Sequence, residues 1–281
     1  MEERIETGTA VVDGVATFFR HLAGEGPPVV LVHGVPTHSE DWMPILERLR
    51  GPAIAIDLPG FGRSDRPPAE VFDYTMEGYA RFFTRFLARM GIGEHSLAVH
   101  DWGSVALVAA QGWPERIRRV ALINALPLFP GYRWHRTARI WRTPLLGELS
   151  TLIRSRRGLD LALRESRGDW SRHEPAFVDL IEKHLDPGTV RAILSLYRSA
   201  PEEALAAAGR GLASLGAPAL VVWGMRDRYL PARFGRAWAG RLPNAELLEL
   251  PDAGHWPWRD DPSSIEPVVR FLQDAADNPQ S

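Results

Sequence analysis

The 281-residue sequence contains no cysteine, which excludes disulfide bonds, thiolate metal ligands and a cysteine nucleophile. It also lacks an excess of one charge: 33 basic and 35 acidic residues give a formal net charge of −2. That balance gives no reason to expect a nucleic acid or an acidic membrane surface as partner. No apolar run approaches the roughly 18 residues of a membrane span, and residues 1–4 are charged rather than apolar. We therefore expect a cytoplasmic protein with no signal peptide and no membrane partner.

Short apolar runs dominate what is present. Two alternating segments, near 5–12 and 15–22, flank the turn Asp13-Gly14 and predict an antiparallel hairpin. Six further runs are each typical of a buried strand: 29–32, 53–56, 97–99, 120–123, 219–222 and 247–250. Helical patterns separate most of them, as at 76–90, 103–112 and 232–241. Strands that alternate with helices predict an α/β fold in which helices flank a mostly parallel sheet of eight strands.

One interval interrupts this alternation. From about Leu128 to Gly211 the pattern is helical, rich in arginine and tryptophan, and without a convincing strand. We expect residues 128–211 to form a helical cap, and 1–127 with 212–281 to form the core. A cap in this position would cover the strand ends where α/β proteins bind ligands. The ten arginines from Arg133 to Arg172 are interpreted as solvated surface, and the tail after Ala276 as frayed.

Asp101 occupies the most informative position in the chain. The run 97–99 is followed by His100-Asp101-Trp102-Gly103, and a helical pattern begins at once. This is the strand-turn-helix context of a nucleophile elbow, with an aspartate where many enzymes have serine. A carboxylate nucleophile attacks a saturated carbon and leaves an alkyl ester that water must open. The ordinary alternative is that Asp101 only caps the following helix.

Three more motifs follow strand ends. His-Gly-Val-Pro at 33–36 is a turn that can aim the Val35 N–H into a site, where it would form an oxyanion hole with the N–H of Trp102. Asp227 follows the run 219–222, and His255 follows 247–250. Taken singly, these are a loop turn, a surface or capping acid and a structural histidine. In chain order with Asp101, they give the acid, acid, histidine sequence of an α/β-hydrolase fold.

Together these motifs resemble the aspartate-nucleophile branch of the α/β-hydrolase fold, which epoxide hydrolases and haloalkane dehalogenases share. Five segments carry the resemblance: 33–36, Asp-Leu-Pro-Gly-Phe-Gly-Arg-Ser-Asp at 57–65, 100–103, Asp227 and 254–255. It implies that Asp101 is the nucleophile, that His255 activates water and that Asp227 orients His255, with no metal or cofactor. Asn124 stands near where some dehalogenases place the orienting acid, but it is not acidic, which favours Asp227.

The leaving group separates the two reactions. An epoxide leaves as an alkoxide and needs a proton, which epoxide hydrolases supply from two cap tyrosines or from a histidine and a tyrosine. The resemblance assigns these roles to Tyr197 and Tyr132, with His135 in reserve. Each tyrosine has an ordinary alternative as a core aromatic with its hydroxyl at the rim.

A halide leaves as an anion and needs N–H donors. Dehalogenases use the tryptophan after the nucleophile with an asparagine in the oxyanion loop or a cap tryptophan. Trp102 is present, but Val35 replaces the asparagine and has no side-chain donor, so Trp134, Trp141 or Trp170 would have to substitute.

We therefore expect an epoxide hydrolase that forms vicinal diols, with haloalkane dehalogenation as the alternative and a non-catalytic ligand receptor as a remote one. A serine esterase would need serine at position 101, and the hydrolases of fluorinated acids typically have arginine at 102. A small apolar substrate should contact His33, Pro36, Trp102 and His135, in a monomer or homodimer.

Overall fold

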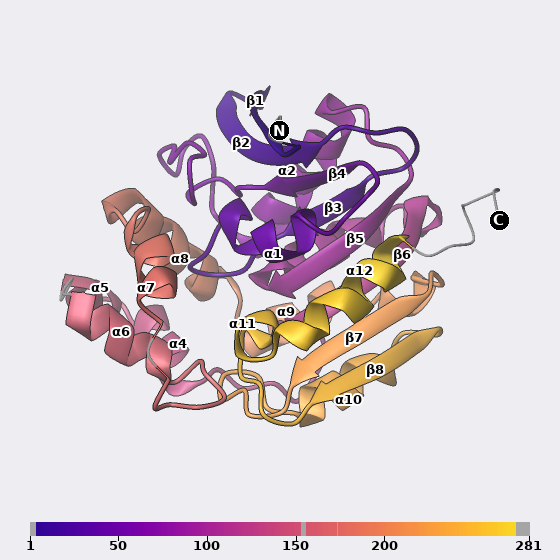
Figure 1. Ribbon diagram of the computed structural model, residues 1–281. Helices are drawn as coiled ribbons and strands as arrows, with labels where there is room; N and C mark the ends of the chain where they lie inside the picture. Colours follow the sequence, from indigo (N-terminus) through magenta and orange to yellow (C-terminus); the bar gives the residue numbers. More distant parts are fainter. Residues whose placement is uncertain (1–3, 153–155, 173, 274–281) are drawn as a thin grey trace.

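The computed structural model describes residues 4–152, 156–172 and 174–273, and its centre is one eight-stranded sheet (Figure 1). The strand order is β1-β2-β4-β3-β5-β6-β7-β8. The strands are β1 (Glu6–Val12), β2 (Val15–Leu22), β3 (Val29–Val32), β4 (Ala53–Ile56), β5 (His95–Asp101), β6 (Ile117–Ala125), β7 (Ala219–Gly224) and β8 (Ala245–Leu250). All eight predicted strands are present, and the predicted α/β-hydrolase architecture with a mostly parallel sheet is confirmed.

The first two strands form the predicted antiparallel hairpin. Asp13 and Gly14 have φ values of 51° and 82°, as a two-residue hairpin turn of the primed type requires. β2 also pairs antiparallel with β4, and every later neighbour is parallel. In β3 and β4 all residues are buried, because parallel strands are covered on both faces.

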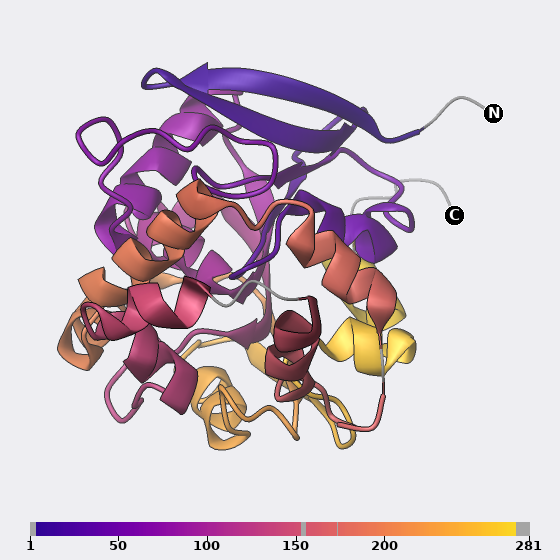
Figure 2. The same cartoon turned by 90° about the vertical axis from the view of Figure 1, so that its left-hand side faces the viewer.

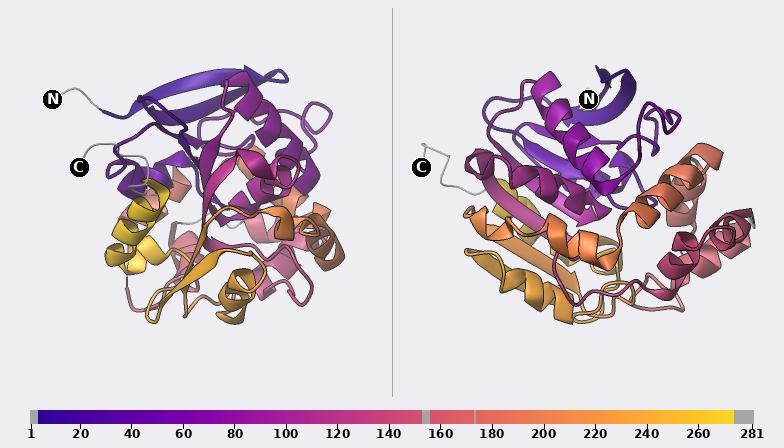
Figure 3. Two further views of the ribbon diagram at one scale, coloured as in Figure 1. Left: turned by 90° about the vertical axis from the view of Figure 1, so that its right-hand side faces the viewer. Right: turned by 180° about the vertical axis from the view of Figure 1, so that it is seen from behind.

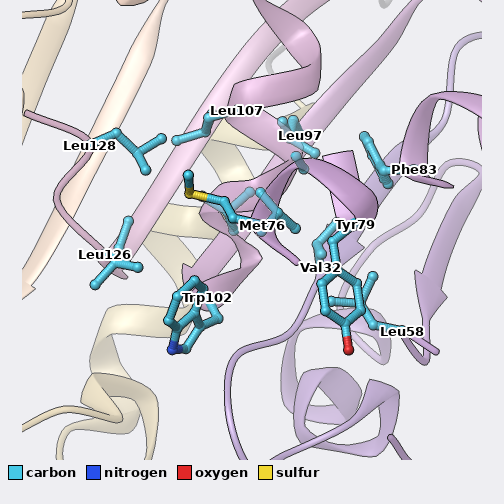
Figure 4. Packing of buried hydrophobic residues seen from close by; sticks show 14 of the residues in the cluster. Val32, Leu58, Met76, Tyr79, Phe83, Leu97, Trp102, Leu107, Leu126 and Leu128 are labelled. Atoms are coloured by element: carbon cyan, nitrogen blue, oxygen red, sulfur yellow. The ribbon is translucent and has the colours of Figure 1, made fainter. Parts of the chain in front are cut away.

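Helices cover the two faces of the sheet and bury two apolar clusters. α2 (Met76–Arg89), α3 (Val105–Ala110) and α10 (Arg233–Ala239) contribute to the first cluster. Figure 4 shows Met76, Tyr79 and Leu107 packed beside strand residues Val32 and Leu97. α1 (Met43–Leu46) and α12 (Ile265–Gln273) contribute to the second cluster, and α11 (Pro257–Asp260) precedes α12. Short 3-10 turns occur at Ser39–Trp42, Trp102–Ser104, Pro114–Arg116, Leu212–Ser214 and Pro262–Ser264.

The described residues between β6 and β7 form six α-helices and no strand. They are α4 (Arg136–Arg142), α5 (Leu146–Leu152), α6 (Arg156–Arg164), α7 (Pro175–Glu182), α8 (Pro187–Ser199) and α9 (Glu202–Ala208). We call α4–α8 the inserted helices. They gather at one end of the sheet (Figures 1 and 3) and lie in front of it when seen from that end (Figure 2). The boundaries of the predicted cap stay a prediction, and the tail after Ala276 lies outside the described residues.

Helix length gives no sign of a membrane span. Within the described ranges no helix combines the length and apolar character needed to cross a bilayer.

Candidate active site

Asp101 is the last residue of β5 and has a strained backbone, with φ 47° and ψ −119°. Two glycines make this sharp turn possible. A Cβ on Gly103 would lie 2.2 Å from the Val32 carbonyl oxygen, and one on Gly34 would lie 2.5 Å from Cβ of Asp101. The Asp101 side chain makes no capping hydrogen bond to the helix that follows. The capping hydrogen bond that the alternative expects is therefore absent, and the turn has the strand-to-helix geometry expected of a nucleophile elbow.

Backbone N–H groups hold the Asp101 carboxylate. The Val35 N–H donates to Oδ2 at 3.0 Å, and the N–H of Trp102 lies beside the same carboxylate. Burial raises the pKa of Asp101 above its usual 3.8, although His255 and these two N–H groups oppose the shift. These are the N–H groups predicted for the oxyanion hole. In the free protein they stabilise the ionised form of the carboxylate itself.

His255 lies between the two acids. Its Nδ1–H donates to Oδ2 of Asp227 at 2.7 Å, while its Nε2 lies 3.8 Å from Oδ1 of Asp101. The second distance is too long for a direct hydrogen bond, so Nε2 is free to bind a water beside the carboxylate. Burial lowers the pKa of His255, but the charge and hydrogen bond of Asp227, together with the charge of Asp101, raise it further, and the net shift is upward from 6.5.

Asp227 is buried and its carboxylate has four donors. Oδ1 accepts the N–H groups of Tyr229 and Leu230 at 2.8 and 3.0 Å, and Oδ2 accepts from His255 and from Nδ2 of Asn124 at 2.5 Å. Burial raises its pKa, but His255, the loop N–H groups and Asn124 lower it more, so the net shift is below 3.8. The acid stays ionised and fixed in orientation.

Asn124 is a site residue whose contact the sequence did not predict. Its Oδ1 accepts the Gly224 N–H at 2.9 Å while its Nδ2 donates to Asp227, so it joins the ends of β6 and β7. The available signal was an amide at the end of an otherwise apolar run. In the sequence, Asn124 stands out only as a position that lacks an acid.

A cavity of about 310 Å³ lies beside Asp101 and His255. Both predicted tyrosines, Tyr132 and Tyr197, line it, and so do Pro36 and His135. The remaining lining residues are mostly apolar and come largely from the interval between β6 and β7, among them Trp134, Ile140, Trp141, Leu159, Leu163, Leu185, Val190 and Ile193. No cluster of three potential metal ligands occurs in the parts of the chain that the structure describes.

The two tyrosines differ in their contacts. The Tyr132 hydroxyl is buried and has no hydrogen-bond partner among the described residues. The Tyr197 hydroxyl lies near the Trp102 indole. Burial, reinforced by the charge of Asp101, raises the pKa of both phenols well above 10, so both are proton donors at neutral pH.

His135 is held in one tautomer. Its Nδ1 accepts the Ala138 N–H at 3.3 Å and so caps α4, while burial lowers its pKa to about 4. The neutral ring therefore carries its proton on Nε2.

Two predicted substrate contacts, His33 and Trp102, lie outside the lining of this cavity. His33 does not line the cavity, because Nδ1 donates to the Gly34 carbonyl at 2.8 Å and Nε2 accepts from the Leu58 N–H at 3.0 Å. The Trp102 ring is also absent from the lining: it stacks on Trp134 with ring centres 5.6 Å apart, and Figure 4 shows it within the apolar core. Its indole N–H is buried without a well-aligned acceptor.

Three known proteins illustrate what the chain is similar to. A cis-3-alkyl-4-alkyloxetan-2-one decarboxylase of Xanthomonas campestris pv. campestris is 29% identical over 282 residues, covering 89% of each chain. Bifunctional epoxide hydrolase 2 of Sus scrofa is 35% identical over 121 residues, 42% of this chain and 21% of that protein. The crystal structure of haloalkane dehalogenase DbeA from Bradyrhizobium elkani has a TM-score of 0.82 at 25% identity, covering 95% of this chain and 97% of that one.

These proteins carry out different reactions, so the likeness does not fix a substrate. It does agree with the resemblance inferred from the motifs, to α/β-hydrolases of the epoxide hydrolase and dehalogenase type. The model of the alpha/beta hydrolase fold family matches residues 27–262, which is most of the chain. The chain therefore belongs to the α/β-hydrolase family of enzymes.

Proposed function

We propose that this hydrolase opens epoxides to vicinal diols through a covalent ester on Asp101. The observation that carries the proposal is the pair of phenols, Tyr132 and Tyr197, in the same cavity as the carboxylate. A strained ring oxygen leaves as an alkoxide, a poor leaving group without a proton. The Tyr132 hydroxyl has no partner within the described structure, so it is free to donate to a bound oxygen.

In the first half-reaction, Oδ1 of Asp101 attacks a ring carbon while its Oδ2 stays bound to the Val35 N–H. The carbon–oxygen bond of the ring breaks, and its electron pair takes a proton from Tyr197 or Tyr132. The product of this step is a hydroxyalkyl ester whose carbonyl oxygen is Oδ2.

In the second half-reaction, His255 removes a proton from a water that attacks the ester carbon. Asp227 holds the imidazole in the productive tautomer and stabilises its positive charge. The N–H groups of Val35 and Trp102 bind the negative charge that develops on Oδ2. Collapse of this intermediate expels the diol oxygen, which takes the proton of the newly formed carboxyl group. The proton on His255 returns to the tyrosinate, so Asp101, His255 and the tyrosine are all restored.

Haloalkane dehalogenation by the same triad is the alternative. A halide needs N–H donors at the cavity, but Val35 has no side-chain donor and the Trp102 indole is buried outside the lining. Of the two tryptophans that line the cavity, Trp134 already donates its Nε1–H to the Ala200 carbonyl at 3.0 Å, which leaves Trp141 as the candidate donor. This arrangement favours the epoxide. We also propose that residues 128–211 act as a cap that shapes the apolar cavity, and that substrates are small and apolar.

Opening of a β-lactone is a second candidate, favoured by the likeness to the Xanthomonas enzyme over 89% of each chain. The same Asp101 attack on a ring carbon would expel a carboxylate, which leaves without a proton. The tyrosines would then be dispensable, whereas epoxide opening requires them.

The deciding experiment offers styrene oxide, 1-bromobutane and a cis-3,4-dialkyloxetan-2-one separately and identifies the products. A diol from styrene oxide supports the proposal. Bromide release or alkene formation without any diol would overturn it, and no turnover of any of the three would favour a ligand receptor.

A pair of variants sharpens this result. Tyr197→Phe should slow alkylation by the epoxide about 100- to 1,000-fold, since it removes one donor to the developing oxyanion. Trp102→Phe is the matched control: it changes the neighbouring ring but keeps the Tyr197 hydroxyl, so alkylation by the epoxide should not slow in this way. Undiminished alkylation in Tyr197→Phe, with halide release that collapses in Trp102→Phe, would assign the enzyme to dehalogenation instead.

A further inference from the structure

Asp260, the last residue of α11, joins two segments that are distant in the chain. Its Oδ2 accepts the N–H of Gly254 at 2.7 Å and the N–H of Gly168 at 2.9 Å. Gly254 immediately precedes His255, and Gly168 lies between α6 and α7. One carboxylate oxygen therefore binds both the loop that carries His255 and the connection between α6 and α7.

A direct contact reinforces this junction. The N–H of His255 donates to the Ser166 carbonyl at 2.7 Å. The backbones are so close that a Cβ on Gly254 would lie 2.3 Å from the Ser166 carbonyl oxygen. A Cβ on Gly168 would lie 1.8 Å from the carbonyl oxygen of Asp252. The position of His255 is thus tied to the position of residues 166–168.

The Asp260 side chain is suited to this role. It is only 8% exposed, and Nη1 of Arg172 lies 3.8 Å from its Oδ1 and donates to its backbone carbonyl at 3.2 Å. Because one oxygen accepts both N–H groups, at 2.7 and 2.9 Å, the side chain fixes the spacing between Gly254 and Gly168.

We infer that Asp260 is a positioning residue that aligns His255 by binding Gly254 and Gly168 together. This inference rests on the proposed function. Asp260 touches neither reacting atom, so it acts through the backbone that carries His255. A misplacement of about 1 Å costs roughly 100-fold in rate, so the hydrolytic half-reaction should depend strongly on this carboxylate.

Alkylation should depend on Asp260 much less. Tyr197 belongs to α8, whose start is tied to the core by Arg66, which pairs with Asp186 at 2.7 Å and donates to Thr189 Oγ1 at 3.1 Å. Asp101 is held by the tight turn at the end of β5 and by the Val35 N–H. Neither anchor involves Asp260, so its loss should separate the two half-reactions.

The test measures both half-reactions with styrene oxide in the full-length protein, by rapid mixing and intact-protein mass spectrometry. In Asp260→Ala, we expect ester hydrolysis to slow about 10- to 100-fold and the ester to accumulate, with alkylation close to that of the unmodified protein. Asp260→Asn should restore hydrolysis, since its amide oxygen can accept both N–H groups. Asp261→Ala, which removes the neighbouring half-buried carboxylate that caps the turn Pro262–Ser264, should have no effect on either step.

Asp260→Glu serves if the alanine variant does not fold, because it keeps the charge and displaces the oxygen by one methylene. Slower hydrolysis with normal alkylation in this variant supports the inference. Equal slowing of both steps, or unchanged hydrolysis, would overturn it. Failure of the proposed function looks different: no ester would then form on Asp101 even when hydrolysis is blocked in His255→Gln.

Discussion

Tyr132→Phe should make the protein more stable and less active at the same time. The Tyr132 hydroxyl is buried without a partner among the described residues, and leaving such a group unsatisfied costs about 1–3 kcal/mol. Phenylalanine keeps the edge contacts of the ring with Trp134 and Phe234, at 5.1 and 5.4 Å between centres. The free energy of unfolding should therefore rise by up to about 1–3 kcal/mol.

The activity should change in the opposite direction. If Tyr132 donates to the ring oxygen, its removal costs about 2.7–4 kcal/mol of transition-state stabilisation, a factor of roughly 100–1,000 in the alkylation rate. The effect shrinks if Tyr197 or His135 compensates. The two tyrosines act on one oxygen, so the double variant should lose less than the product of the two single losses.

Urea unfolding measures the first effect, and the rate of ester formation with styrene oxide in a His255→Gln background measures the second. Tyr79→Phe is the matched control, since the Tyr79 hydroxyl is equally buried but donates to the Pro59 carbonyl at 2.8 Å. It should lose about 1 kcal/mol of stability and keep its alkylation rate. A stabilised Tyr132→Phe with undiminished alkylation would make Tyr132 structural, and a destabilised one would refute the premise that its hydroxyl is unsatisfied.

Three further predictions concern the triad. In single turnovers in labelled water, the first diol should carry unlabelled oxygen from Asp101, and Asp101→Ala should abolish turnover without unfolding; label in that first product would mean direct attack by water. His255→Gln should block only hydrolysis, so mass spectrometry should find a substrate adduct on the peptide containing Asp101, whereas normal turnover would make His255 structural. Hydrolysis needs a neutral His255 and should fall as pH drops through the pKa of His255 in the ester, which Asp227 still raises; Asp227→Asn removes this raising cause, so the acid limb should move to lower pH, and a stationary limb would contradict the assignment.

Much of the fold could be predicted from the sequence because buried parallel strands have a strong local signature. The runs 29–32 and 53–56 match β3 and β4 in full, since every residue in them is buried. Asp101, Asp227 and His255 were predicted because each follows a strand end, and carboxyl ends of parallel strands meet at one edge. The structure brings these three together, with one hydrogen bond and one gap of 3.8 Å.

The direction in which a side chain points was harder to predict. Trp102 follows the nucleophile, yet its ring stacks on Trp134 and leaves only its backbone N–H at the carboxylate. His33 belongs to the same turn as the predicted contact Pro36, but both of its ring nitrogens form hydrogen bonds with backbone groups. These outcomes depend on which groups are packed nearby. The contacts of Asp260 were harder still to predict, because its partner Gly168 lies 92 residues away in the chain.

The proposed mechanism makes opposite demands on the site in its two half-reactions, and the charge on Asp101 links them. The first step needs an ionised Asp101 in an apolar cavity, where burial raises its pKa and the N–H groups of Val35 and Trp102 oppose that shift. The second step needs a neutral His255, whose pKa Asp101 helps to raise. Forming the ester removes that negative charge, so the pKa of His255 falls as its role as a base begins. The nucleophile's own reaction therefore prepares the base for the next step.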